Sequence, residues 1–239
     1  MKRSKIFLCL AICLVLVLSL EGCQNFQLSF MATPTQPWPT SAYTAIPEPT
    51  STPTPTETPE PTVVPFKQFS GSGFTIMLPE TFFGGSLSTN LNAIVQKIKE
   101  MGLDEADTIT SLKKDKNSAS FFAFDTRVGK NNDLINISVM KQSTSTQVPM
   151  DVLMKAIQDK FFATCKGCSL DLTKTLDVNG HPGGRIDITS PTPKFDTKQS
   201  LYIVEEKKAV WLVVFTVGKG SYKEYKPLFE KSIQTFTLE

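Results

Sequence analysis

A stretch of proline and threonine between Thr33 and Pro65 sets the main limit on what this chain can fold into. It holds ten of the sixteen prolines, together with ten threonines, in 33 residues. Proline lacks a backbone N–H and fixes φ, so neither a helix nor a strand ladder can continue through it. Its few large apolar side chains cannot offset the entropy lost on folding. We therefore expect a disordered, polyproline-II-biased stalk reaching at most about 100 Å; the alternative is a proline-rich recognition site.

The residues ahead of the stalk have the order of an export signal. Three basic residues stand at the start (Lys2, Arg3 and Lys5), and an apolar run follows from Ile6 to Leu20. As a helix this run would span about 22 Å, less than the ~30 Å hydrocarbon core of a bilayer. That length is typical of a signal peptide rather than a stable transmembrane helix.

The end of this run resembles the lipobox of bacterial lipoproteins. Leu20, Gly22 and Cys23 match its positions, while Glu21 stands where a small or hydroxyl residue is usual. The resemblance implies that residues 1–22 are removed and that the Cys23 sulfur receives a diacylglycerol. Two or more acyl chains, such as palmitate, would hold the protein stably on a membrane. An ordinary secretory signal cut elsewhere and an uncleaved anchor are the alternatives. Residues 23–65 would then be the lipidated cysteine and the stalk.

Residues 66–239 have the composition of one folded domain, long enough for a substantial core. Apolar alternation predicts a strand over 74–78, ended by Pro79. Apolar residues at helical spacing between Leu91 and Met101 predict a helix, capped by Ser88 or Thr89 and closed by Gly102. A second short helix is expected over 103–112, and strands over 121–126 and 134–140, the latter with Ile135, Ile137 and Val139 on its buried face.

The second half of the domain contains a hairpin signal at Asn179-Gly180. Even-numbered apolar residues from Leu170 to Val178 precede it, and Ile186 and Ile188 follow it. A helix is expected after Pro149, and a charged turn at 205–208 joins strands over 201–204 and 209–217. The second of these strands is apolar on both faces, which predicts a central, doubly covered strand. The last helix is expected over 222–236, with Pro227 in its true first turn or at a kink.

These elements describe an α+β domain with a central, mainly antiparallel sheet flanked by helices. Three segments resemble the PsbP-like superfamily, which is named for an extrinsic protein of photosystem II: 71–82, 178–188 and 210–236. The resemblance covers about a third of the domain and implies an α/β/α sandwich. Its motifs are structural, so no catalytic, metal-binding or partner-binding residue carries over from the family.

Cys165 and Cys168 are the two cysteines of the expected domain, at the predicted end of a helix. The spacing and an extracytoplasmic location favour a small local disulfide. The alternative is a dithiol redox centre in which Lys166 lowers a thiol pKa. His181, the single histidine, could pair with either cysteine in a hydrolase but is more simply a solvated turn residue. Asp104, Glu105 and Asp107 lack the spacing of a calcium loop, and a zinc site would need four ligands.

A net charge of +2 leaves no footprint for nucleic acid. The sequence shows no recognisable nucleophile–base pair, metal set or phosphate loop, so we expect no cofactor and no enzymatic activity. The sequence therefore predicts a membrane-anchored, extracytoplasmic lipoprotein whose domain binds an envelope protein or a small ligand. The alternative is an envelope thiol-redox protein that uses Cys165 and Cys168.

Overall fold

The structure, a computed structural model, describes residues 64–102, 106–114, 120–130, 132–192 and 195–239. The expected signal peptide, Cys23 and nearly all of the stalk lie outside these residues. The described elements are, in chain order, β1 (Phe66–Gly71), β2 (Phe74–Pro79), β3 (Phe82–Ser86), α2 (Leu87–Glu100), α3 (Ala106–Lys114), β4 (Phe121–Asp125), β5 (Asn136–Ser143), α4 (Met150–Thr164), β6 (Ser169–Val178), β7 (His181–Ser190), β8 (Thr197–Glu206), β9 (Ala209–Gly218), α5 (Tyr222–Ile233) and β10 (Thr237–Leu238).

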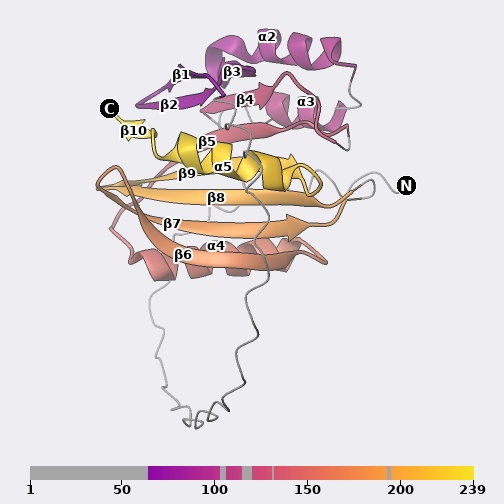
Figure 1. Cartoon of the computed structure of the whole chain (residues 1–239). Coiled ribbons are helices and arrows are strands. Elements are labelled where there is room, and N and C mark those ends of the chain that lie inside the picture. The colour runs from indigo at the N-terminus through magenta and orange to yellow at the C-terminus, as the bar shows by residue number, and fades with distance from the viewer. Residues whose placement is uncertain (1–63, 103–105, 115–119, 131, 193–194) are drawn as a thin grey trace, which may run out of the picture. The chain divides into compact units, whose positions relative to one another are not determined.

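Seven strands form the main sheet, in the order β3-β4-β5-β9-β8-β7-β6. Every neighbouring pair in it is antiparallel. The predicted α+β class, with a mainly antiparallel sheet flanked by helices, is confirmed (Figure 1). A second, three-stranded sheet with the order β1-β2-β10 was not predicted. The strand expected over 74–78 belongs to this small sheet, where β2 pairs with β1 and β10.

The main sheet is covered on both faces, and β9 lies at its centre, as its apolar sequence predicts. Val210, Leu212 and Val214 pack with α2, α3 and α4 on one face. Trp211, Val213 and other odd-numbered residues of β9 pack with α5 and the small sheet on the other. Because successive side chains of a strand point to opposite faces, one strand supplies both cores. We call these the α4 face and the α5 face.

One helix begins earlier than the sequence predicts, and another begins where it is predicted but places its proline differently. The helix α2 begins at Leu87, ahead of both expected caps, because Leu87 is itself buried against the sheet; Ser86, not Ser88 or Thr89, is the N-cap. Gly102 follows it with φ 68°, as expected of a helix end. The helix α5 begins at Tyr222, as predicted, and ends at Ile233; Pro227 therefore lies inside it and not in its first turn. Pro227 is exposed, so its ring faces solvent rather than the sheet.

The predicted hairpin at Asn179-Gly180 is confirmed, with φ 50° at Asn179 and 82° at Gly180. The expected alternation in β6 is broken, however, by a register shift between Leu170 and Leu172. Leu172 pairs with Asp187 on the α5 face, whereas Leu170 pairs with Ile188 on the α4 face. The four even-numbered apolar residues therefore do not share one face, and Leu170 is 44% exposed.

Strand β5 also differs from its prediction. The expected buried face, with Ile135, Ile137 and Val139, packs toward α5 and the small sheet. Its other face is buried as well, since Met140 packs into the core on the α4 face and Asn136 is 6% exposed. The strand is therefore covered on both sides.

Candidate functional site

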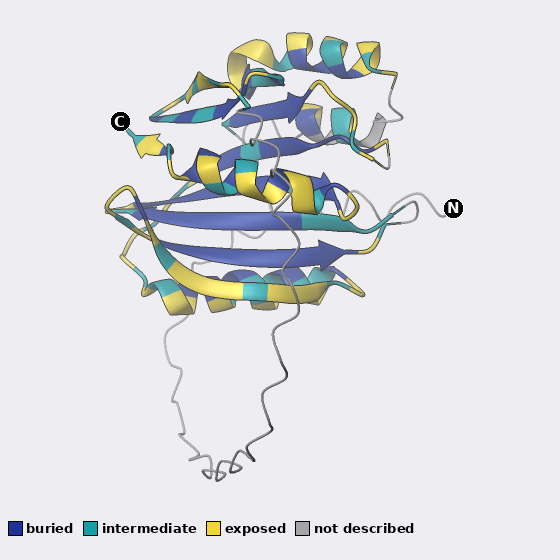
Figure 2. Ribbon diagram, in the orientation of Figure 1, coloured by how far each residue is buried: buried dark blue, intermediate teal, exposed yellow. Residues whose placement is uncertain are grey.

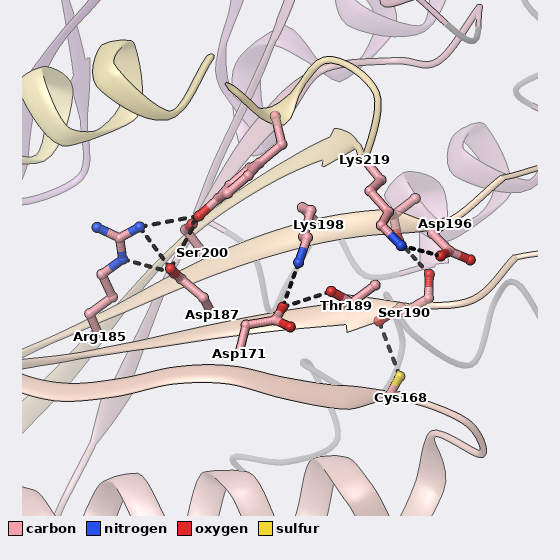
Figure 3. A network of polar contacts seen from close by, with 12 residues as sticks. Cys168, Asp171, Arg185, Asp187, Thr189, Ser190, Asp196, Lys198, Ser200 and Lys219 are labelled. Carbon is pink, nitrogen blue, oxygen red and sulfur yellow. Dashed lines mark hydrogen bonds and ion pairs between the residues drawn. The ribbon is translucent and has the colours of Figure 1, made fainter. Parts of the chain in front are cut away.

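A group of charged and hydroxyl side chains lies on the α5 face of β6, β7 and β8, beside the edge of the main sheet (Figure 3). It arises because β7 alternates: Ile186 and Ile188 enter the core on the α4 face, so the odd-numbered residues between and beside them point the other way. We name this group the polar band and define it by its members: Asp171, Arg185, Asp187, Thr189, Lys198, Ser200, Tyr222 and Glu230.

Arg185 is the centre of the polar band. Its Nε and Nη2 donate to the two carboxylate oxygens of Asp187, each at 2.8 Å, and its Nη1 donates to Glu230 at 2.7 Å. The side chains of Arg185 and Asp187 are only 3% and 8% exposed. Tyr222 donates its hydroxyl to Asp187 at 3.1 Å, and the guanidinium lies 5.2 Å from the ring of Tyr202. Burial alone would lower the pKa of Arg185, but these hydrogen bonds outweigh it and raise the pKa, so the side chain stays charged.

Asp171, in the irregular part of β6, forms the second centre of the polar band. Lys198 donates to its carboxylate at 2.8 Å and Thr189 at 2.6 Å. Burial would raise the pKa of Asp171, but these two donors lower it overall. The side chains of Lys198 and Asp171 are 17% and 32% exposed, so this pair is accessible from solvent where the Arg185 pair is not.

The disulfide lies near the end of β7 at which Thr189 contacts Asp171, as Figure 3 shows for Cys168 and Ser190. Cys165 directly follows α4 and Cys168 directly precedes β6, and their sulfurs are bonded. This is the location that the sequence predicts, between the end of a helix and a strand. Cys165 is 7% exposed and Cys168 is half-buried. The Cys168 Sγ lies 3.2 Å from the Oγ of Ser190, which is fully buried.

His181 is far from both cysteines. It begins β7 opposite Val178, whereas the disulfide lies near the other end of the hairpin, where Ser169 pairs with Thr189. Eight residues of extended strand separate the two ends by about 27 Å. A cysteine–histidine arrangement is therefore not formed, and His181 is a half-exposed strand residue next to the Asn179-Gly180 turn.

The acidic cluster lies at a gap in the described part of the chain. Asp104 and Glu105 lie outside the described residues, as does the side chain of Asp107. Within the described part of the chain, no group of three or more His, Cys, Asp or Glu residues is placed to hold a metal ion. Across those same residues, no helix is both long and apolar enough to cross a membrane.

A second buried carboxylate, Asp125 at the end of β4, was missed in the sequence. Its side chain is fully buried and accepts hydrogen bonds from Arg127 Nη2 and the Tyr225 hydroxyl, each at 2.8 Å. Burial would raise the pKa of Asp125, but the donors on Arg127 and Tyr225 lower it overall. Asp125-Arg127 and Arg185-Asp187 share one sequence signal, which is opposite charges two residues apart at or in an apolar strand.

Comparison with known proteins yields likenesses of fold only. No known family model matches the chain, and no curated protein matches it. The cyanobacterial PsbP of Synechocystis sp. PCC 6803 is 9% identical, with a TM-score of 0.49 over 77% of this chain and 98% of that one. LpqN of Mycobacterium tuberculosis, involved in cell envelope biogenesis, is 10% identical, with a TM-score of 0.47 over 72% of this chain and 91% of that one. A putative regulator of unknown function from Pseudomonas aeruginosa is 13% identical, with a TM-score of 0.41 over 44% of this chain and 74% of that one. These values assign no activity, partner or site residue.

Proposed function

We propose that this protein is a lipoprotein held on the extracytoplasmic face of a membrane through Cys23, with a non-catalytic domain that binds an envelope protein along β6. The observation that carries the binding role is the free edge of the main sheet. β6 is ten residues long, ends the strand order and pairs with β7 alone among the described strands. Figure 2 shows most of it exposed beside the buried strands β7 and β8.

The side chains beside this edge support a binding role rather than catalysis. The charges of the polar band are engaged with one another: Arg185 with Asp187 and Glu230, and Lys198 with Asp171. Such mutual pairing fixes side-chain positions but leaves no activated base or nucleophile among them. An exposed strand edge offers backbone groups to a partner strand, and flanking side chains then select the partner. Leu172, Lys174 and Leu176 project on the α5 face of β6 and would make this selection.

The stalk supports the same proposal from the sequence. A tethered domain is confined near the membrane, which raises its effective concentration toward membrane partners. The reach of at most about 100 Å sets the distance over which it could find them.

Anchoring is tested by replacing Cys23 with serine. We expect the variant to lose labelling by a fatty-acid analogue and to leave the membrane fraction, because the sulfur proposed to carry the diacylglycerol is removed. Cys13→Ser is the matched control: it alters a cysteine inside the expected signal and should keep both the label and the membrane location. A Cys23→Ser chain that stays labelled and membrane-bound would show that the anchor lies elsewhere.

Binding along β6 is tested by reversing the charge of Lys174, an exposed residue in the middle of the strand. In pull-downs of the lipidated protein from solubilised membranes, Lys174→Glu should reduce recovery of the partner about tenfold, as expected for about 1.4 kcal/mol of lost complementarity. Lys99→Glu makes the same change of charge on the exposed face of α2 and should leave recovery unchanged. If every recovered protein responds equally to both variants, β6 is not the binding edge.

A further inference from the structure

We propose that the Cys165–Cys168 disulfide is a thiol–disulfide exchange site that opens through Cys168, with a protein dithiol as its reductant. This goes beyond the binding role, which uses neither sulfur. It rests on a difference between the two sulfurs that the sequence does not reveal. The two cysteines are three residues apart and bonded, yet they differ in access and in helix position, and the hydroxyl of Ser190 lies beside Cys168.

Exposure to solvent favours Cys168 as the sulfur that an incoming thiolate attacks. An attacking thiolate must reach one sulfur from outside along the S–S bond. Cys165 is 7% exposed and packs with the core on the α4 face, among residues that include Phe161. Cys168 lies at the rim of this core and is half-buried. An incoming thiolate therefore meets Cys168 first.

The backbone favours Cys168 as the nucleophile of the reduced pair. Cys165 is the C-cap of α4, and its backbone N–H donates to the carbonyl of Phe161. The carbonyl end of a helix carries partial negative charge, which disfavours a thiolate held there. Burial disfavours it further, since a charged sulfur loses hydration. Both effects keep Cys165 a neutral thiol in the reduced protein.

A buried hydroxyl, that of Ser190, lies beside the sulfur of Cys168. This hydroxyl lies 3.2 Å from Cys168 Sγ, and because a disulfide sulfur has no proton, the hydroxyl is the donor in this contact. Ser190 is fully buried in β7, so its side chain is fixed by the sheet and not by the cysteine turn. In the reduced protein the same hydroxyl can donate to the Cys168 thiolate and stabilise it. Cys168 is thus the nucleophile of the reduced pair, and Ser190 is its positioning residue.

The exchange balances as two displacement steps. A thiolate of the reductant attacks Cys168 Sγ, the Cys165–Cys168 bond breaks, and Cys165 leaves with the electron pair and takes a proton from water. The second thiol of the reductant, as a thiolate, then attacks its own partner sulfur in the mixed disulfide and releases Cys168. The reductant ends as a disulfide, and this protein has gained two electrons. The reverse sequence, begun by Cys168, would reduce a disulfide in another protein.

The test uses the oxidised, full-length lipidated protein and, as probe, a thioredoxin whose second active-site cysteine is replaced by serine. This probe lacks the second thiol that would resolve the mixed disulfide, and rapid alkylation of the freed cysteine prevents the reverse attack. Mass spectrometry of the adduct peptides should find at least about ten times more probe on Cys168 than on Cys165. Equal adducts, an excess on Cys165, or a disulfide that stays intact with excess probe would overturn the proposal.

A second measurement tests Ser190 without relying on the adduct. After reduction, alkylation of Cys168 should be faster than that of Cys165, and Ser190→Ala should move the Cys168 rate profile to higher pH while leaving Cys165 unchanged. A profile that does not move would remove Ser190 from the proposal. Both measurements are independent of partner binding along β6, so the failure of one proposal is distinguishable from the failure of the other.

Discussion

Replacing Arg185 with methionine is expected to lower the free energy of unfolding by about 3–5 kcal/mol, because it leaves a buried carboxylate without its cation. Arg185 makes two 2.8 Å hydrogen bonds to Asp187, and the Asp187 side chain is only 8% exposed. Methionine matches the length of the arginine stem but supplies no donor. Tyr222 alone would then face the Asp187 charge. Urea unfolding followed by the fluorescence of Trp211, which is fully buried, measures the loss.

The control for this prediction is the double variant Arg185→Met/Asp187→Leu. Removing both charges also removes the unpaired carboxylate, so the double variant should recover most of the lost stability. Glu230 is 42% exposed and can be hydrated once Arg185 is gone. A double variant no more stable than Arg185→Met would show that packing of the arginine stem, rather than its charge, stabilises this part of the sheet.

Strands and helices with a regular apolar pattern could be predicted from the sequence. The strand β9 is apolar on both faces, and it is the fourth of seven strands with a core on each side. The small sheet could not be predicted, because β1 alternates only weakly and β10 has two residues. Both strands depend on pairing with β2, a tertiary contact that no local pattern encodes. The irregular pairing in β6 likewise depends on its partner strand, so the face of Leu170 was predicted wrongly.

In the candidate site, too, residues placed by local signals could be predicted, and residues placed by tertiary contacts could not. The positions of Cys165 and Cys168 follow from the end of one helix and the start of one strand, and these local signals were sufficient to predict where the two cysteines lie. The polar band was missed because a lone Arg185 or Asp187 resembles an ordinary solvent-facing strand residue. Its burial depends on Tyr222 and Glu230, which α5 brings to β7 from far along the chain. Ser190 was missed for the same reason, since only the hairpin fold brings it next to Cys168.

Asp125→Asn is expected to lower the free energy of unfolding by about 2–3 kcal/mol near neutral pH, because it weakens hydrogen bonds made to a buried charge. The carboxylate accepts from the side chain and backbone N–H of Arg127 and from the hydroxyl of Tyr225. An amide keeps one acceptor oxygen for these donors and turns an N–H toward the others. Arg127 is about half exposed and can be hydrated, so the loss should stay below that of the Arg185 variant.

The pH dependence of this loss identifies the carboxylate as its source. The pKa of folded Asp125 lies below the unfolded value of 3.8, since the donors of Arg127 and Tyr225 outweigh its burial. A lowered folded pKa gives stability that is fully present above the unfolded pKa and is lost as the pH falls through the folded pKa. The difference in unfolding free energy between wild type and Asp125→Asn should therefore be constant above about pH 5 and shrink below about pH 4. Other carboxylates, Asp171 among them, titrate equally in both proteins and cancel in the difference. A difference that does not change between pH 6 and pH 3 would mean that the substitution acts through shape alone, and that the Asp125 charge contributes nothing to holding β4 against α5.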